Sequence, residues 1–450
     1  MQPDQPDRSL FPNDFVWGVS TSAPQTEGGS SDGSRGASIW DDFQSRGFFN
    51  RKKITPGNTC DFQHHYKQDI DILHQLGIRH FRLSIAWPRI LPNGKGQINQ
   101  AGIDFYRNVF DYCLNKGITP WVTLYHWDLP LALEKLGGWA NREIVDWFCD
   151  YVRVCVDSFK DQVRHWMVLN EPLVFTGAGY FIGVHAPGRR GMKNFLPALH
   201  HALLAQGKGS RLIRTLQPDA NIGSTFSCSQ LTPLTNTAKD RNAVKRMDAL
   251  LNRLMIEPAL GMGYPTAELP VLERLNKIMQ PGDDTLLHAD FDFIGVQNYT
   301  REVVTANRWV PYLGARLVPA KNRHVPHTEM GWEVHPPSIY EMIKQFSAYP
   351  QVKKMFITEN GASFQDQIVN GRVDDQNRMD YFKGYIGQVQ KAVQEGFPVN
   401  GYFAWSLTDN FEWAEAYKQR FGLVYIDFNT QQRTIKNSGY WYGDFIQGIK

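Results

Sequence analysis

Short apolar runs alternate with longer amphipathic stretches along almost the whole chain. The runs are rich in β-branched and aromatic residues and have the length of strands, whereas the stretches between them repeat their apolar positions with a helical period. Strands are predicted at residues 15–20, 81–87, 119–127, 166–170, 221–227, 291–297, 355–359 and 402–407. Helices are predicted at 61–76, 102–116, 142–159, 195–216, 238–260, 337–346, 377–395 and from Lys436 onwards.

Strict alternation of strands and helices indicates a parallel sheet covered by helices. Eight such repeats favour a closed α/β barrel, the (β/α)8 or TIM barrel. An open doubly wound sheet is the alternative, and it would need a glycine-rich phosphate loop after the first strand. Gly28 and Gly29 follow that strand, but they lack the G-x-G-x-x-G spacing. We therefore expect the barrel.

The chain has 450 residues and no Ser-, Gly- or Pro-rich linker of useful length. The polar, proline-containing stretch 310–337 is predicted to be a long loop between a strand and a helix. We therefore expect residues 1–450 to form one barrel domain with extended βα loops, a size that barrels with insertions reach.

Polar residues stand where several of the strand runs end. In a (β/α)8 barrel the carboxyl ends of the strands meet at one mouth, and active sites are built there. The polar and aromatic residues at these ends are His126, Trp127 and Asp128 after the third run, Asn170 and Glu171 after the fourth, Asn298 and Tyr299 after the sixth, Glu359 and Asn360 after the seventh, and Asp409, Asn410, Glu412 and Trp413 after the eighth.

Two of these residues are carboxylates that follow apolar strands. Cleavage of a glycosidic bond requires such a pair, one to protonate the leaving oxygen and one to attack or to activate water. A single strand-end glutamate is more often the partner of a nearby Arg or Lys. Glu171 and Glu359 are accompanied by amide, imidazole and indole groups, which suit sugar hydroxyls and the apolar faces of sugar rings. This combination favours a sugar site.

Charge and cysteine usage narrow the class of partner. The chain has 48 Lys and Arg against 45 Asp and Glu, so its formal net charge of +3 argues against nucleic acid or an anionic membrane as partner. The five cysteines have neither C-x-x-C spacing nor an even number, and we expect buried thiols. The N-terminus lacks an apolar leader and no apolar run reaches membrane-spanning length. These features favour the cytoplasm, and they carry no signal of oligomeric state.

The chain resembles the family 1 glycoside hydrolases over nearly its whole length. The resemblance lies in segments 15–18 (FVWG), 21–28 (TSAPQTEG), 38–41 (SIWD), 81–89 (FRLSIAWPR), 124–130 (LYHWDLP), 169–172 (LNEP), 357–361 (ITENG) and 405–413 (WSLTDNFEW). Any one of these motifs is modest evidence, whereas their number and order are highly specific.

The resemblance implies a role for each matching position. Glu171 would be the general acid/base and Glu359 the nucleophile, with Arg82 and Tyr299 bonded to that nucleophile. Arg82 and a hydroxyl would then lower the pKa of Glu359, and the resulting anion with partial burial would raise the pKa of Glu171. The substrate-binding positions would be Gln25, His126, Trp127, Asn170, Trp332, Trp405, Glu412, Trp413 and Phe421, with Trp405 beneath the sugar and Trp332 beside the leaving group.

The implied activity is retaining hydrolysis of terminal β-D-glucosides, with β-galactosides and β-fucosides as further substrates. The implied partner is a small-molecule β-glycoside or oligosaccharide, and no metal or organic cofactor is implied. Two alternatives stay open: a 6-phospho-β-glycosidase, whose members carry Ser where Glu412 stands, and a non-catalytic sugar- or protein-binding relative. Asn298 departs from the common family pattern beside Tyr299, so the resemblance does not fix the leaving group.

Overall fold

The computed structural model describes residues 5–29, 33–46 and 59–449. Residues 1–4, 30–32, 47–58 and 450 of the predicted domain lie outside this part of the chain. Within it, no helix is long and apolar enough to cross a membrane.

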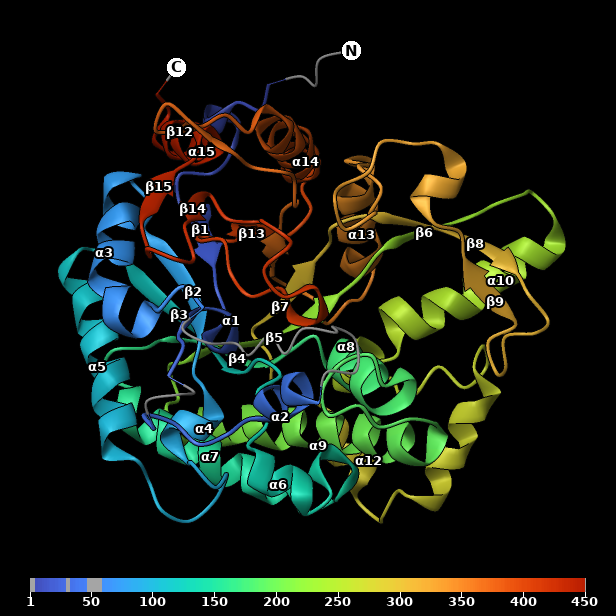
Figure 1. Cartoon of the computed structure of the whole chain (residues 1–450). Coiled ribbons are helices and arrows are strands. Elements are labelled where there is room, and N and C mark those ends of the chain that lie inside the picture. The colour runs from blue at the N-terminus through green and yellow to red at the C-terminus, as the bar shows by residue number, and fades with distance from the viewer. Residues whose placement is uncertain (1–4, 30–32, 47–58, 450) are drawn as a thin grey trace.

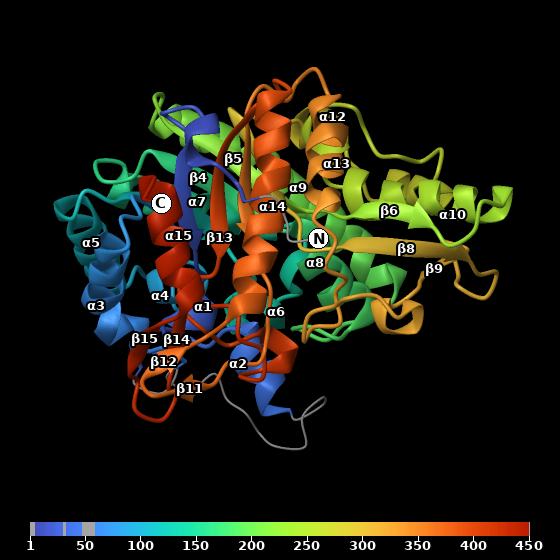
Figure 2. The same cartoon turned by 90° about the horizontal axis from the view of Figure 1, so that it is seen from above.

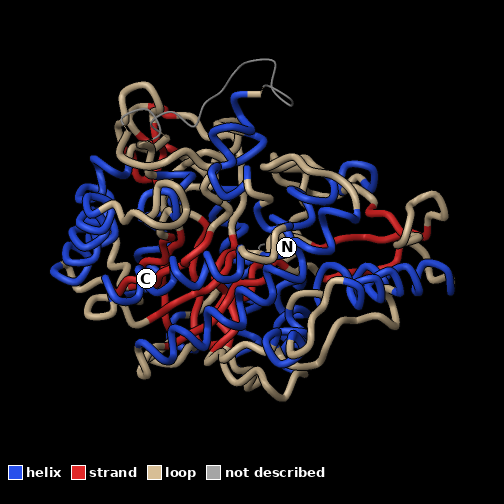
Figure 3. The backbone as a smooth tube through the Cα atoms, turned by 90° about the horizontal axis from the view of Figure 1, so that it is seen from below, coloured by secondary structure: helices blue, strands red, loops and turns tan. Residues whose placement is uncertain are grey.

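Eight parallel strands close into a barrel with the order β1-β13-β10-β7-β5-β4-β3-β2. Each strand pairs in parallel with its neighbours, and the first strand closes the ring against the last and the second (Figures 1 and 3). The predicted (β/α)8 barrel is therefore confirmed. The barrel strands are β1 (Val16–Ser20), β2 (His80–Ser84), β3 (Thr119–Tyr125), β4 (His165–Asn170), β5 (Asn221–Ser227), β7 (Phe293–Gln297), β10 (Met355–Asn360) and β13 (Val399–Trp405).

All eight predicted runs overlap a barrel strand, but several strands end earlier than predicted. β2 stops at Ser84, because Trp87 and Pro88 already begin a short helix, and proline fits the first turn of a helix. β3 stops at Tyr125, and Trp127 adopts a left-handed backbone conformation with φ of 77°. The chain turns at these points, so the residues that follow lie at the barrel mouth.

Helices cover the outside of the barrel, as Figures 2 and 3 show. The predicted helix 238–260 is interrupted, because a π-helical turn separates α10 from α11. The longer helices are α3 (Phe62–Gln75), α5 (Gln100–Asn115), α7 (Ile144–Phe159), α9 (Met192–Leu216), α10 (Ala238–Asp248), α13 (Pro337–Ser347), α14 (Gln376–Gln394) and α15 (Asn437–Gln447). The short ones are η1 (Arg8–Leu10), α1 (Ala23–Thr26), α2 (Ile39–Ser45), α4 (Trp87–Ile90), α6 (Leu131–Lys135), η2 (Gly138–Ala140), α8 (Pro172–Thr176), η3 (Gly177–Ile182), η4 (Ala249–Arg253), α11 (Ile256–Ala259), η5 (Pro270–Lys277), α12 (Asp283–Leu287), η6 (Ala320–Arg323) and η7 (Trp413–Glu415).

The barrel has two apolar clusters, and a third small one lies between α10, β8 and β9. The larger one fills the space between strands and helices. A smaller cluster consists of Trp121, Met167, Phe293, Phe356 and Phe403. The ring centroid of Trp121 lies 4.9 Å from that of Phe356 and 5.2 Å from that of Phe403, although their strands are not neighbours in the barrel. These side chains therefore meet inside the barrel, and we call them the aromatic plug.

Three small sheets lie outside the barrel. They pair β6 (Gln230–Pro233), β8 (Arg301–Ala306) and β9 (Ala315–Leu317), then β11 (Ile368–Val369) with β12 (Arg372–Val373), and β14 (Val424–Ile426) with β15 (Arg433–Ile435). The predicted long loop 310–337 does connect a barrel strand to a helix, but it contains β9 and η6. In Figure 2 the first of these sheets extends away from the barrel together with α10.

Candidate active site

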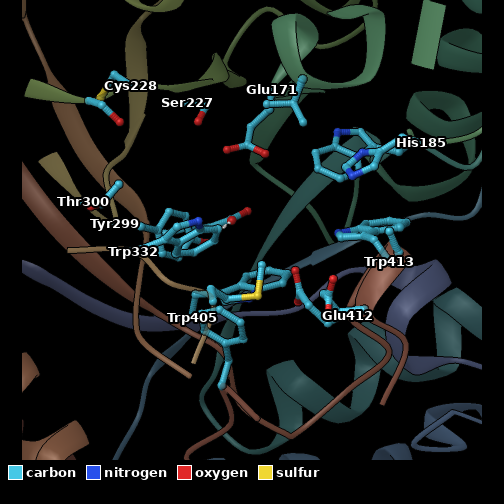
Figure 4. Close-up of a pocket in the computed structure, with 18 of the residues that line it drawn as sticks. Glu171, His185, Ser227, Cys228, Tyr299, Thr300, Trp332, Trp405, Glu412 and Trp413 are labelled. Atoms are coloured by element: carbon cyan, nitrogen blue, oxygen red, sulfur yellow. Dashed lines mark hydrogen bonds between the residues drawn. The ribbon is translucent and has the colours of Figure 1, made fainter. Parts of the chain in front are cut away.

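A cavity of about 360 Å³ opens at the carboxyl ends of the barrel strands. Most of the predicted site residues line it, and Figure 4 shows the Glu171 side chain pointing into it from the side opposite Trp405. The predicted residues on its wall are His126, Trp127, Glu171, Tyr299, Trp332, Glu359, Trp405, Glu412, Trp413 and Phe421. The predicted residues that are absent from this wall are Gln25, Arg82 and Asn170.

Glu359 lies within β10 and is held by two donors. The Arg82 guanidinium donates from Nη1 to Oε1 over 2.5 Å, and the Tyr299 hydroxyl donates to Oε2 over 2.6 Å. Arg82 is fully buried on β2, so its charge reaches Glu359 with little screening by solvent. Burial and the negative charge of Glu359 raise the pKa of Tyr299 well above its ordinary value, so this hydroxyl remains a donor.

Glu171 follows β4 in a left-handed conformation with φ of 46°, directly before Pro172 begins α8. Burial raises the pKa of its carboxyl well above the ordinary value, and the nearby negative charge of Glu359 raises it further. A hydrogen bond from Ser227 and the charge of Arg82 act in the opposite direction, but they are smaller effects. Burial and the charge of Glu359 therefore favour the protonated form of Glu171.

The pKa of Glu359 differs from its predicted direction. Arg82 and Tyr299 do lower it, as expected, but burial raises it more, so that it lies above the ordinary value. The expectation of a lowered pKa was therefore wrong, because desolvation of the carboxylate was not included. The difference between the two glutamates remains: Glu171 faces the charge of a carboxylate, whereas Glu359 faces the charge of a guanidinium.

Aromatic rings and a carboxylate form the wall around Trp405. The Trp413 ring lies 4.5 Å from the ring of Trp127 and 6.1 Å from that of His126. Burial and the charge of Arg82 lower the pKa of His126 well below its ordinary value, so the imidazole is neutral. Burial and the charge of Glu359 raise the pKa of Glu412 to about 8. This wall offers flat apolar faces together with polar groups that can bond hydroxyls.

Gln25, Arg82 and Asn170 lie behind the cavity wall, although Gln25 and Asn170 were predicted to contact the sugar. Asn170 Oδ1 accepts from Arg82 over 2.6 Å, and its Nδ2 lies 3.0 Å from His126 Nε2. The Gln25 side chain donates to the Phe411 carbonyl over 2.9 Å and lies 3.4 Å from Glu412 Oε2. Both amides are fully buried, so in this structure they position the groups that form the wall.

Trp332 and Phe421 lie on the side of Tyr299. The half-buried Trp332 ring lies 5.2 Å from the ring of Tyr299 and 6.0 Å from that of Phe421. Figure 4 shows Tyr299 and Trp332 side by side, across the cavity from Trp413.

Sequence reasoning missed several residues of the wall. Ser227 is the last residue of β5 and bonds Glu171. Because it also ends a predicted strand run, the strand-end rule applies to it and would have found it. His185 lies in a loop after η3 with its ring 5.7 Å from that of Trp127, and no local pattern marks it. The other missed residues are Val174, Cys228, Ser229, Thr300, Glu302, Met330, Ala414 and Glu415.

Fold and cavity together define a class: a (β/α)8-barrel glycosidase with two buried carboxylates at its mouth. The model of glycosyl hydrolase family 1 matches residues 7–450. Beta-glucosidase A of Thermotoga maritima is 42% identical over 448 residues, which cover 97% of this chain and 98% of that protein. The 1,4-beta-D-glucan glucohydrolase of Thermotoga neapolitana is 41% identical with the same coverage. The chain belongs to glycosyl hydrolase family 1.

A solved structure supports the same conclusion. The beta-glucosidase from Thermotoga maritima in complex with glucoimidazole is similar to this chain with a TM-score of 0.92 and 42% sequence identity. The match covers 98% of this chain and 99% of that one.

Proposed function

We propose that this chain hydrolyses terminal non-reducing β-D-glucosides by double displacement, with Glu359 as nucleophile and Glu171 as general acid/base. The observation that carries the proposal is the opposite setting of two carboxylates in one cavity. Glu359 accepts bonds from a guanidinium and a hydroxyl, whereas Glu171 is buried beside the charge of Glu359. Environments that separate two pKa values in this way assign the base and the acid of a glycosidase.

In the first step a Glu359 oxygen attacks the anomeric carbon as the bond to the leaving oxygen breaks. Glu171 donates its proton to that oxygen, so the alcohol leaves neutral. Arg82 and Tyr299 keep the Glu359 carboxylate oriented, and this orientation lowers the entropic cost of reaching a reactive geometry. The product is a covalent glucosyl ester on Glu359.

In the second step the negative charge of Glu359 is gone, because its oxygen carries the sugar. The pKa of Glu171 then falls, and its carboxylate removes a proton from water as that water attacks the anomeric carbon. The ester bond breaks, Glu359 regains its charge and the pKa of Glu171 rises again. Two inversions leave the sugar with its original β configuration.

The proposed substrate range follows from the relatives and from the wall around Trp405. Relatives named as β-glucosidases support a glucoside, and β-galactosides and β-fucosides are proposed as further substrates. We assign hydroxyl binding to His126, Glu412 and Trp413, ring contact to Trp405 and leaving-group contact to Trp332. Trp127 and Phe421 complete the wall, and Gln25 and Asn170 support Glu412 and His126 from behind.

We also propose that residues 1–450 work as one domain in the cytoplasm. Pairing of β1 with β13 supports one domain, since it joins the two ends of the chain in one barrel. Five unpaired cysteines, four of them buried, support a reducing compartment.

The anomer released first tests the proposed mechanism. Proton NMR of an aryl β-D-glucoside during hydrolysis should show β-glucose first, followed by slow mutarotation to the α anomer. Initial α-glucose would exclude Glu359 as nucleophile, since a single inversion needs no covalent intermediate. If no glucoside is hydrolysed, the galactoside and the 6-phosphoglucoside are tested next. Absence of hydrolysis with all three would favour the alternative of a non-catalytic sugar- or protein-binding protein.

Glu412 provides a separate prediction about the sugar itself. Replacing Glu412 with Ser should lower kcat/KM for 4-nitrophenyl β-D-glucoside by roughly 10²-fold, the equivalent of about 3 kcal/mol for the loss of two hydrogen bonds to the sugar. The matched control is Glu341→Ser on α13, which removes a half-buried carboxylate outside the cavity wall and should change the same constant by less than about threefold. Equal effects of the two substitutions would remove Glu412 from the sugar site.

A further inference from the structure

Six charged side chains form a buried group within and beside residues 406–423, the loop between β13 and β14 that carries Glu412 and Trp413. We call this group the ion cluster. Its members are Asp366, Asp375, Arg378, Asp409, Arg420 and Lys436. Three acids face three bases, so each charge has a partner of opposite sign, as burial of charge requires. Five of the side chains are fully buried and the sixth is 19% exposed. All six are absent from the cavity wall.

Asp409 holds the two ends of the 406–423 loop together. Its Oδ1 accepts from Lys436 Nζ over 2.6 Å and from the Gly422 amide over 3.0 Å. Its Oδ2 accepts from Arg420 Nη1 over 2.5 Å. A Cβ at position 422 would lie 2.1 Å from the Asp409 amide nitrogen, so only glycine permits this approach. One carboxylate therefore closes the loop, and the part that lines the cavity lies between the joined ends.

The ion cluster also reaches the chain segment that follows Glu359. Lys436 Nζ donates to Asp366 Oδ2 over 2.5 Å, and Asp366 lies in the loop after β10, the strand that contains Glu359. Arg378 donates to both oxygens of Asp366, over 2.9 and 3.1 Å, and to the Arg420 carbonyl over 2.7 Å. Lys436 and Arg378 stand at the starts of α15 and α14, which lie side by side in Figures 1 and 2. The cluster therefore fixes the loop relative to the strand of the proposed nucleophile.

The cavity-lining part of the loop has a strained backbone. Trp413 and Ala416 adopt left-handed conformations, with φ of 43° and 55°. Residues other than glycine rarely do so, because the Cβ atom crowds the backbone, and such conformations persist only where the surrounding structure enforces them. The Glu412 amide donates to the Ala416 carbonyl over 2.6 Å across this turn. Release of the loop ends would let the turn relax and would displace Glu412 and Trp413 together.

We propose that Asp409 and Lys436 are positioning residues that set the selectivity for the sugar's hydroxyl groups through Glu412 and Trp413. This inference rests on the proposed function, in which those two side chains bond the sugar, and it adds a determinant of specificity outside the cavity. Glu359 keeps its own two donors, which lie outside the ion cluster. Weakening the cluster should therefore reduce discrimination between sugars that carry or lack the bonded hydroxyls more than it reduces the chemical step.

The double variant Asp409→Asn/Lys436→Met tests the inference. It removes one acid and one base, so the rest of the cluster stays neutral, and both replacements keep roughly the original size. 4-Nitrophenyl β-D-glucoside is compared with its 2-, 3-, 4- and 6-deoxy analogues, and each ratio of kcat/KM values measures recognition of one hydroxyl. The ratios that Glu412→Ser lowers identify the hydroxyls that Glu412 bonds. In the double variant those same ratios should fall at least about fivefold, the equivalent of one net hydrogen bond.

A loss of stability alone cannot produce this result. A smaller folded fraction lowers kcat/KM for every substrate by the same factor, which cancels in the ratios. The matched control is Glu257→Gln/Arg253→Met, which removes another acid and base, paired over 2.7 Å outside the cavity wall. Its deoxy ratios should stay at the wild-type values. If the double variant of the cluster does not fold, Arg420→Met replaces it, since that arginine is partly exposed and its loss should lower the same ratios about twofold.

The same measurements distinguish failure of the inference from failure of the proposed function. Unchanged ratios in the cluster variant, beside lowered ratios in Glu412→Ser, would overturn the inference and leave the proposed function standing. An equal fall in the control pair would also overturn it, since the effect would then not belong to the ion cluster. If the wild type hydrolyses no glucoside, the proposed function fails and the inference fails with it.

Discussion

Glu359→Gly is expected to lower hydrolysis of 4-nitrophenyl β-D-glucoside by more than about 10⁴-fold, a scale of loss seen when hydrolases lose their nucleophile. The variant lacks the oxygen that attacks the anomeric carbon, while Arg82 and Tyr299 remain around an empty space. Azide is small enough to enter that space, and its negative charge suits the Arg82 guanidinium. Added azide should therefore attack the bound sugar directly and yield α-glucosyl azide, detected by NMR.

The control for this experiment is a buried carboxylate away from the cavity. Asp69 on α3 is paired with buried Arg433, with Oδ1 2.9 Å from Nε. Asp69→Gly also leaves a buried guanidinium unpaired, so it matches the effect of Glu359→Gly on folding but not on chemistry. Its activity should not respond to azide. Turnover by Glu359→Gly at the wild-type rate, or a β-configured azide product, contradicts the assignment.

Glu171→Ala is expected to separate substrates by the quality of their leaving groups. Alkyl glucosides and cellobiose need a proton on the departing oxygen, so their kcat/KM should fall by about 10²–10⁴-fold. A 2,4-dinitrophenyl glucoside leaves without that proton, and formation of its glucosyl ester should slow only a little. Removal of that ester should become limiting, because the base for water is missing. Azide should then accelerate turnover and give β-glucosyl azide.

The pH dependence of kcat/KM provides an independent test of the role of Glu171. In the proposed mechanism Glu171 acts while protonated, and burial together with the charge of Glu359 raises the pKa of its carboxyl. In the wild type kcat/KM should therefore decline as the pH rises through that pKa. Glu171→Ala has no such proton to lose, so the alkaline decline should disappear for the activated substrate. Equal losses on all leaving groups, with the decline intact, would argue against Glu171 as the acid.

Most of the barrel could be predicted from local patterns. Runs such as 119–127 are long and rich in β-branched and aromatic residues, and their apolar character persists because both faces of a barrel strand are buried. Boundaries were less accurate where a local feature ended the strand early, as Pro88 does after β2. The break after Asp248 lies within a continuous helical pattern, and the apolar periodicity does not distinguish a π-helical turn.

In the candidate site, too, some features could be predicted from the sequence and others could not. Residues at strand ends could be placed at the mouth because the fold rule fixes that end of every strand. Whether a side chain lines the cavity depends on what packs in front of it, and this packing leaves Asn170 and Gln25 out of the cavity wall. The direction of the Glu359 pKa depends on desolvation, which is a property of the whole assembled pocket and not of neighbouring residues.

The aromatic plug closes the barrel at the end opposite the mouth. Trp121 and its four partners fill the interior, so a sugar that enters at the mouth has no exit on the far side. A glucan chain cannot pass through a barrel that is closed in this way, so only its terminal residue can reach the cavity and be hydrolysed. Released glucose must leave through the same mouth by which the next substrate enters. Glucose is therefore expected to be a competitive inhibitor.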